Sequence, residues 1–227
     1  MVTSGNLLCG MFSLILAFHG RFVPAAWLIF FAVIFDGLDG KVARSLGGGS
    51  QFGLEFDSLA DLVSFGVAPG LLIDIASLDQ LGGVAGGVIA CFFALCVALR
   101  LARFNVVHVP GPFQGLPSPA GGLFVASFVL AGIPLDPLLL GVVLIFTGLL
   151  MVSSVPYANL KKLTRESADR RKCLLVLGLV SLCFTFLKEA APLALFSIYI
   201  VSGLLRFDWG EWLLRPDRTE ADVSHSQ

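Results

Sequence analysis

The chain has 227 residues and a formal net charge of −1 at pH 7; 56% of its residues are hydrophobic and only 14% are charged. Soluble domains carry about 25% charged residues, so this chain lacks the polar groups needed to cover a water-facing surface. The composition excludes a soluble globular protein and predicts an integral membrane protein. Nucleic-acid binding is also excluded as the main activity, because no basic domain with interleaved aromatic residues is present.

Long stretches without Asp, Glu, Lys or Arg recur along the chain, as membrane-spanning helices require. A helix needs about 20 residues to cross the hydrocarbon core, and lipid tolerates no exposed loop backbone. We therefore predict an all-α, polytopic membrane bundle of about eight transmembrane helices, near residues 5–20, 22–39, 57–75, 81–104, 117–133, 137–155, 172–188 and 191–206. Residues 1–206 are expected to form one membrane domain, and residues 207–227 a cytoplasmic tail.

The distribution of cations predicts how the bundle is oriented. With a cytoplasmic N-terminus, eight spans place thirteen of the fifteen Lys and Arg residues on the cytoplasmic side and leave Arg21 and Lys188 outside. The positive-inside rule thus predicts that both termini are cytoplasmic. The basic segments 161–165 and 170–172 are expected to bind anionic membrane lipids. With no targeting segment recognised, we expect the cell (inner) membrane of a bacterium or archaeon.

Four aspartates interrupt the apolar pattern near the predicted cytoplasmic boundary. Asp36 and Asp39 are three residues apart, and Asp57 and Asp61 are four apart, so each pair shares a helical face. With a loop at 45–52 returning the chain, all four carboxylates can face one spot. An ionised Asp inside a membrane costs ~2.5–3.5 kcal/mol, so a cation must balance them. Carboxylate oxygens suit Mg²⁺ or Mn²⁺, and four acids could hold two ions.

Small residues accompany these acids. Gly40 and Ala43 lie on the stripe of Asp36, and Gly53 lies one turn before Asp57. A helix face without bulky side chains would let a flat base or a diphosphate approach the backbone. Small residues also allow two membrane helices to pack closely. A cation-coupled transporter is a second interpretation, because intramembrane carboxylates also mark ion pathways. That interpretation expects acids near the bilayer midplane on discontinuous helices, whereas these cluster at one boundary.

The segment from Asp36 to Asp61 resembles the CDP-alcohol phosphatidyltransferase family. It matches the signature D-x2-D-G-x2-A-R-x8-G-x3-D-x3-D at all eight fixed positions. The resemblance implies an enzyme that displaces CMP from a CDP-linked lipid and joins the phosphatidyl group to an alcohol, and it makes a homodimer the default. It also implies metal ligands at Asp36, Asp39, Asp57 and Asp61, with Asp61 as the general base as well. The implied surface for the CDP-lipid comprises Asp36, Gly40, Ala43, Arg44, Gly53 and Asp57.

Three further stretches resemble the branch of this family that uses L-serine as the acceptor. They are Ser64-Phe65-Gly66-Val67-Ala68-Pro69-Gly70, Arg100-Leu101-Ala102-Arg103-Phe104-Asn105 and Gly115-Leu116-Pro117-Ser118-Pro119-Ala120. The resemblance implies CDP-diacylglycerol and L-serine as substrates, with glycerol 3-phosphate and inositol as alternative acceptors.

Two arginines at the predicted cytoplasmic end of the fourth helix have a matching chemistry. A guanidinium binds a carboxylate through two parallel hydrogen bonds. We predict that one of Arg100 and Arg103 binds the serine carboxylate and the other a phosphate, unless both only anchor the helix on the cytoplasmic side. Asn105 either hydrogen-bonds near them or caps the helix.

Overall fold

Helices make up all the regular secondary structure in the part of the chain that the structure describes. The computed structural model describes residues 2–45, 51–106, 115–134, 136–155, 157, 169–207 and 212, and only the backbone of residues 2, 40–45 and 170. No strand occurs among these residues. The predicted all-α fold is confirmed.

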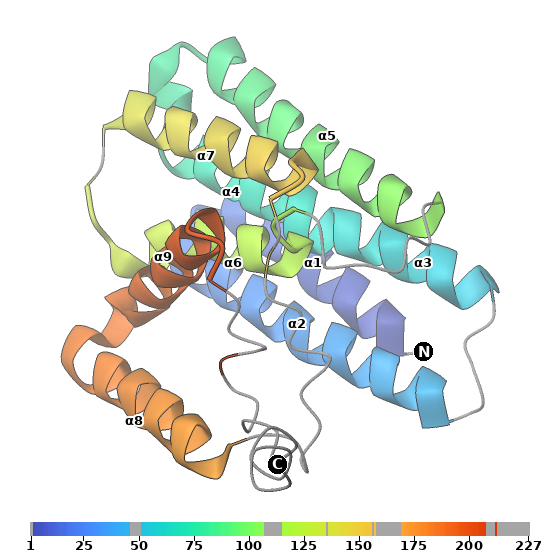
Figure 1. The fold of residues 1–227 in the computed structure, drawn as a ribbon. Coiled ribbons are helices and arrows are strands. Elements are labelled where there is room, and N and C mark those ends of the chain that lie inside the picture. Colours follow the sequence, from blue (N-terminus) through green and yellow to red (C-terminus); the bar gives the residue numbers. More distant parts are fainter. Residues whose placement is uncertain are drawn as a thin grey trace, which may run out of the picture.

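The helices follow the predicted order along the chain (Figure 1). They are α1 (Val2–Phe18), α2 (Phe22–Ser45), α3 (Gln51–Asp61), the π-helical segment η1 (Leu62–Val67), α4 (Ala68–Ala76), the 3₁₀ turn η2 (Leu78–Leu81), α5 (Val84–Val106), α6 (Ser118–Ala131), α7 (Pro137–Val152), α8 (Arg170–Leu187), the 3₁₀ turn η4 (Lys188–Ala190) and α9 (Ala191–Leu204). The helices around the aspartates are longer than predicted. Because α2 continues to Ser45 and α3 begins at Gln51, the predicted loop at 45–52 is shorter and all four acids lie inside helices.

Four helical segments are long and apolar enough to cross a membrane. They are Phe22–Asp39, Gln51–Ala76, Val84–Val106 and Arg171–Leu204, of which the last contains both α8 and α9. Three shorter apolar helices cover Thr3–Phe18, Ser118–Ala131 and Pro137–Val152. The predicted number of about eight spans and the cytoplasmic placement of both termini stay predictions.

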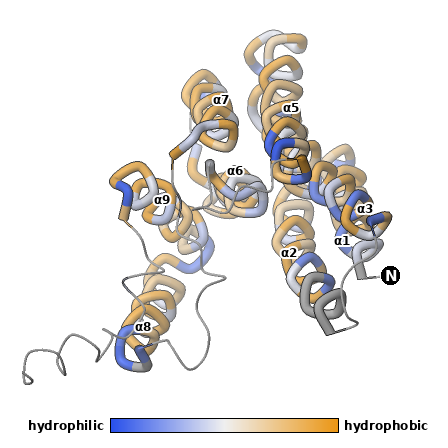
Figure 2. The backbone as a smooth tube through the Cα atoms, turned by 45° about the vertical axis from the view of Figure 1, so that its right-hand side comes forward, coloured by the Kyte–Doolittle hydropathy of each residue, from blue (hydrophilic) through white to orange (hydrophobic). Residues whose placement is uncertain are grey.

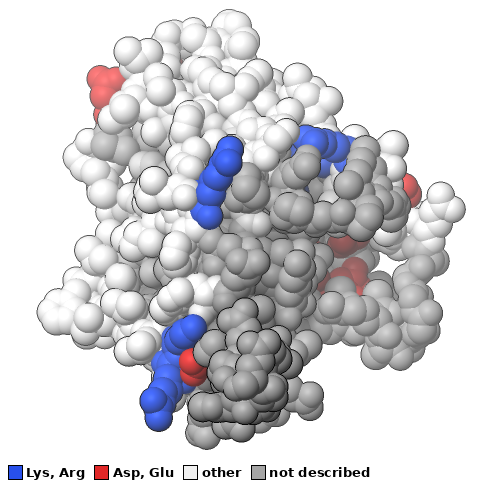
Figure 3. All heavy atoms as spheres, viewed as in Figure 1, with Lys and Arg blue, Asp and Glu red and all other residues white. Residues whose placement is uncertain are grey.

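The outer surface of the bundle is apolar. Leu177 of α8 is 65% exposed and Phe186 is 77% exposed, and hydrophobic residues dominate the helices in Figure 2. Much of the face seen in Figure 3 carries no charge. Exposed apolar side chains over so many helices are what contact with lipid requires, as expected of an integral membrane protein.

Helix α6 lies at the centre of the bundle and joins two apolar cores (Figure 1). Val125 packs in a core shared with α5, α7 and α9, whereas Leu123 and Ala126 pack in a core shared with α1, α2 and α4. Gly122 lets α6 approach η1 directly, because an added Cβ would lie 2.7 Å from the Phe65 carbonyl oxygen. A residue with no side chain is therefore needed at this crossing.

The segment η1 continues the helix of α3 directly after Asp61, but in the wider π form. Its Ser64 hydroxyl donates a 2.8 Å hydrogen bond to the backbone carbonyl of Asn6 on α1. The contact is close, since a Cβ added at Gly10 would lie 2.9 Å from the Ser64 Cα. Single π turns inside α-helices are frequent at functional sites. This one fixes α1 against the helix that carries Asp61.

Tyr157, which follows α7, docks against α9. The side chain is 2% exposed, its ring lies 5.7 Å from that of Tyr199, and its hydroxyl donates to the Ile200 carbonyl oxygen at 3.4 Å. Burial raises the pKa of Tyr157 to about 12, with the nearby Tyr199 as a smaller cause, so the phenol stays neutral at physiological pH. Tyr157 thereby links α7 to α9.

Candidate active site

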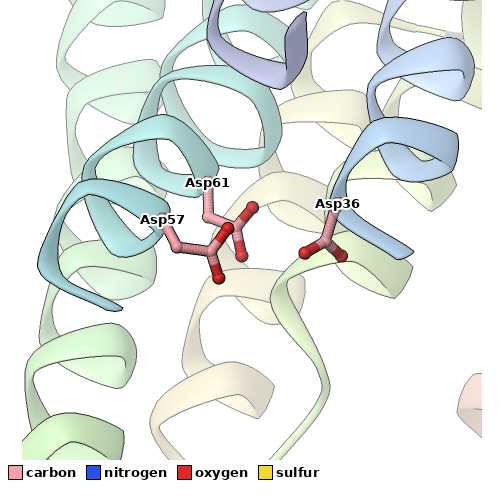
Figure 4. Close-up of side chains that lie close together, drawn as sticks. All are labelled: Asp36, Asp57 and Asp61. Atoms are coloured by element: carbon pink, nitrogen blue, oxygen red, sulfur yellow. The ribbon is translucent and has the colours of Figure 1, made fainter. Parts of the chain in front are cut away.

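Three of the four motif aspartates meet between α2 and α3. Asp36 comes from α2, and Asp57 and Asp61 lie one turn apart on α3 (Figure 4). One carboxylate oxygen of each lies within 4.8 Å of those of the other two. Asp61 is only 9% exposed, whereas Asp36 and Asp57 are half-buried. The predicted convergence of acids from two neighbouring helices is therefore seen for these three.

Asp39 lies outside that group of three. Its carboxylate accepts a hydrogen bond from the hydroxyl of Thr3 on α1, and Asp39 is half-buried. Thr3 itself is only 5% exposed. The structure thus brings three of the four predicted metal ligands together and holds the fourth against α1.

Asn6 is a further polar neighbour of the cluster that sequence reasoning missed. Its side-chain amide donates a 2.8 Å hydrogen bond to Asp61 Oδ1, and the residue is fully buried. Thr3 was missed in the same way. The available signal was that Thr3 and Asn6 are three residues apart on one face of an otherwise apolar helix, where buried polar groups need hydrogen-bond partners.

The donor set fits a hard divalent cation. Carboxylates this close repel one another unless a cation lies between them, and carboxylate oxygens with water are the ligands that Mg²⁺ and Mn²⁺ prefer. The Oδ1 atom of Asn6 is buried and has no hydrogen-bond partner within the described residues. Such an atom commonly accepts a hydrogen bond from ordered water.

Only part of the predicted surface for the CDP-lipid lies within the residues that the structure describes. Gly53 lies in α3 one turn before Asp57 and is partly exposed, whereas the helix was predicted to begin only near residue 57. The predicted residues Gly40, Ala43 and Arg44 lie in the helical extension of α2, and their side chains fall outside the described part of the chain.

Arg100 lies close to the acid cluster. Its Nη1 donates a hydrogen bond to the hydroxyl of Ser118, the first residue of α6, at 2.5 Å. The guanidinium is also near enough to interact electrostatically with the Asp61 carboxylate and the Tyr199 phenol. Arg100 therefore lies near Asp61 of α3, Ser118 at the start of α6 and Tyr199 of α9.

The other two residues predicted for this region point to different neighbours. Arg103 is exposed and donates to the Val152 carbonyl oxygen at the end of α7, at 3.4 Å. Asn105 donates to the Ser58 hydroxyl at 3.0 Å and to the Glu55 carboxylate at 3.3 Å. Among the contacts described, Arg100 is thus the member of this set that interacts with the acid cluster.

Comparison with known proteins agrees with this geometry. The family model for CDP-alcohol phosphatidyltransferases matches residues 1–160. The chain belongs to the CDP-alcohol phosphatidyltransferase family. The predicted resemblance is confirmed, and the chain is a phosphotransferase of this family. Helices α8 and α9 lie beyond the matched residues.

Relatives of this phosphatidyltransferase carry serine in their names. A CDP-diacylglycerol--serine O-phosphatidyltransferase from Helicobacter pylori is 35% identical over 218 residues, which cover 91% of this chain and 89% of the relative. One from Methanocaldococcus jannaschii is 35% identical over 211 residues, which cover 92% and 94%. An archaetidylserine synthase from Methanothermobacter thermautotrophicus is 38% identical over 168 residues, which cover 72% and 70%.

Proposed function

We propose that this enzyme transfers the phosphatidyl group of CDP-diacylglycerol to the hydroxyl of L-serine, giving phosphatidylserine and CMP. The observation that carries the proposal is the meeting of Asp36, Asp57 and Asp61 within the full family signature. The choice of serine is supported by two relatives named for this reaction, each aligned over more than nine tenths of the chain.

Asp61 is the general base in this proposal. It takes the proton of the serine hydroxyl as that oxygen attacks the β-phosphorus in line with the departing CMP. A P–O bond to serine forms, the P–O bond to CMP breaks, and CMP leaves with the negative charge. Burial of Asp61 at 9% exposure keeps competing water away from this proton transfer.

Divalent cations complete the proposed site. Two Mg²⁺ or Mn²⁺ ions would be held by Asp36, Asp39, Asp57 and Asp61. Their charge would stabilise the diphosphate and the leaving phosphate. The CDP part would lie along Gly40, Ala43, Arg44 and Gly53, beside Asp36 and Asp57.

Arg100 is proposed to bind the serine carboxylate, and Arg103 a phosphate. Support comes from the neighbours of Arg100, because the Asp61 carboxylate and the Ser118 hydroxyl both interact with its guanidinium. A carboxylate bound there would bring the serine hydroxyl toward the proposed base. Asn105, which binds α3 through Ser58, would support this region from the side of α5.

The protein is proposed to reside in the cell (inner) membrane as a homodimer, with the site and both termini facing the cytoplasm. Lipid tails must stay in the bilayer while L-serine arrives from water, so the cytoplasmic boundary is where both substrates meet. The apolar exterior supports a membrane location, and the cation distribution supports the orientation.

The decisive experiment follows radiolabelled L-serine into chloroform-soluble lipid while CMP release is measured. We expect a labelled product whose formation requires CDP-diacylglycerol and either Mg²⁺ or Mn²⁺. Glycerol 3-phosphate and inositol are tested in parallel. Product with one of these but not with serine would overturn the acceptor assignment, and absence of CMP release with all three would overturn the proposed reaction.

A further inference from the structure

We propose that Thr3 and Asn6 of α1 are positioning residues for the acids of the active site. This inference rests on the proposed function and deepens it. In it, Asn6 sets the orientation of Asp61, and Thr3 holds the end of α2 through Asp39. Helix α1 thereby fixes the two acid-bearing helices relative to each other.

The contact between Asn6 and Asp61 is buried and anchored at both ends. The Asn6 amide donates to Asp61 Oδ1 at 2.8 Å, while its own backbone carbonyl accepts from Ser64 at 2.8 Å. Asn6 is fully buried, so bulk water does not compete for these bonds. One oxygen of Asp61 is thereby held by the amide, which restricts rotation of the carboxylate.

An amide has the right charge for this task. A lysine or arginine at the same place would neutralise Asp61 and oppose both cation binding and proton uptake. The neutral Asn6 amide orients the carboxylate without removing its negative charge. Its buried Oδ1, which has no partner within the described residues, also supplies an acceptor for water beside the acids.

Thr3 makes the corresponding contact on the other acid-bearing helix. It lies three residues before Asn6, hence on the same face of α1, and its hydroxyl donates to Asp39 of α2. Both side chains are almost fully buried, at 5% and 0% exposure. One face of α1 therefore holds a carboxylate from α2 and another from α3.

Glycines let α1 come close enough for these contacts. A Cβ added at Gly5 would lie 2.7 Å from the Phe35 ring of α2, and one at Gly10 would lie 2.5 Å from the Ser64 hydroxyl of η1. Since α1 packs directly against both neighbouring helices at these glycines, a small shift of α1 would move both acids.

Ser13 provides a matched control on the same helix. It is also fully buried, and its hydroxyl donates to the Ala25 carbonyl oxygen of α2 at 2.8 Å. It lies seven residues after Asn6, about 10 Å along the helix. Ser13→Ala therefore removes a buried hydrogen bond between α1 and α2 without touching any acid.

The test compares Asn6→Ala, Thr3→Val, Thr3→Ser and Ser13→Ala in the full-length protein. Turnover and both KM values are measured, and Mn²⁺ alone is titrated by electron paramagnetic resonance without substrates. Loss of a residue that hydrogen-bonds to a metal ligand typically costs about 10–100-fold in metal affinity or activity. We expect Asn6→Ala to lower kcat about 10–100-fold with the KM for CDP-diacylglycerol little changed.

Thr3→Val keeps the shape of threonine and removes its hydroxyl. We expect it to weaken Mn²⁺ binding by about 10-fold, and Thr3→Ser, which keeps the hydroxyl, to restore binding close to the unchanged protein. Ser13→Ala should leave kcat, KM and Mn²⁺ binding unchanged, even where its melting temperature falls. Should Asn6→Ala fail to fold, the comparison of Thr3→Val with Thr3→Ser decides.

Two results would overturn the proposal. One is an unchanged kcat in Asn6→Ala together with unchanged Mn²⁺ binding in Thr3→Val. The other is a loss in Ser13→Ala as large as in Asn6→Ala, which would mean that any buried bond of α1 matters equally. Failure of the proposed function looks different, because Mn²⁺ binding is measured without substrates and does not depend on the acceptor.

Discussion

Asp61 differs from the other clustered acids in its surroundings. It is the most buried of the three, at 9% exposure, it accepts a hydrogen bond from Asn6, and Arg100 lies close to it. Asp36 and Asp57 are half-buried. A group that must take a proton from a substrate benefits from such enclosure, because bulk water is kept out of the transfer.

Replacing this carboxylate by the isosteric amide tests its role. We expect Asp61→Asn to lower kcat by about 10²–10⁴-fold, the contribution typical of general-base catalysis, and to leave CDP-diacylglycerol binding measurable. Labelled-serine incorporation reports turnover, and ligand-induced thermal stabilisation reports binding. Asp79→Asn, at an exposed position in η2, is the control. Turnover near that of the control would remove Asp61 from the role of base.

The two arginines of α5 are expected to respond differently to substitution by lysine. Arg100→Lys keeps the charge but loses the planar pair of donors that binds a carboxylate. The apparent KM for serine should therefore rise about 10-fold, which corresponds to about 1.4 kcal/mol and is close to the contribution of one hydrogen bond to a charged group. Arg103, which is exposed, should affect the apparent KM for CDP-diacylglycerol instead. Steady-state kinetics with each substrate varied separately distinguish the two. Unchanged kinetics for both variants would indicate that they only anchor the helix.

Helix α6 and the π segment η1 form the contact on which the site rests. Gly122 of α6 faces the backbone of Phe65, four residues after Asp61, and a Cβ there would meet the carbonyl oxygen at 2.7 Å. Backbone atoms cannot move aside as the end of a flexible side chain can. The packing of α6 therefore constrains the position of the helix that carries the proposed base.

Gly122→Ala should destabilise the protein by ~1–3 kcal/mol through overpacking. Gly178→Ala in α8 is the matched control, because no atom lies within 4 Å of the added Cβ, and alanine in a helix is favoured over glycine by ~0.5–1 kcal/mol. Thermal unfolding in detergent should show a lower melting temperature for Gly122→Ala and an unchanged or higher one for Gly178→Ala. Equal melting temperatures would show that α6 can move away from η1 at little cost.

The helices could be predicted because each one corresponds to a run of the sequence with few or no charged residues. The π form of residues 62–67 could not be predicted, because no local pattern distinguishes it from the predicted α-helix. It occurs where Ser64 contacts α1, and that contact joins residues far apart in the sequence. The ends of α2 and α3 were also missed. Hydropathy marks where an apolar run stops, whereas both helices continue through the polar motif.

The acids of the site could be predicted, but their supporting contacts could not. The spacing of Asp57 and Asp61 places both on one face of a helix whatever surrounds it. Asn6 reaches Asp61 across 55 residues of sequence, and Thr3 reaches Asp39 across 36. Such pairs depend on how α1 packs, and a single sequence does not record that.

One continuous helical rod of the bundle is long enough to cross a bilayer. The helical rod of α3, η1 and α4 covers 26 residues, or about 39 Å at 1.5 Å per residue, which exceeds the ~30 Å of the hydrocarbon core. The proposed base Asp61 lies in its first half, whereas η2 follows its far end. The acid cluster and η2 should therefore lie toward opposite sides of the membrane.

This separation makes the proposed orientation testable with two cysteines. In a variant without native cysteines, Gln51→Cys lies at the exposed first residue of α3 and Gln80→Cys lies at an exposed position of η2. We expect a membrane-impermeant maleimide applied to intact cells to label position 80 and to label position 51 only after the membrane is opened. The physical reason is the positive-inside rule, which places the cation-rich ends in the cytoplasm. The reverse labelling pattern would invert the proposed topology and put the acid cluster on the wrong side for cytoplasmic serine, whereas labelling of both positions in intact cells would contradict a rod that crosses the bilayer between them.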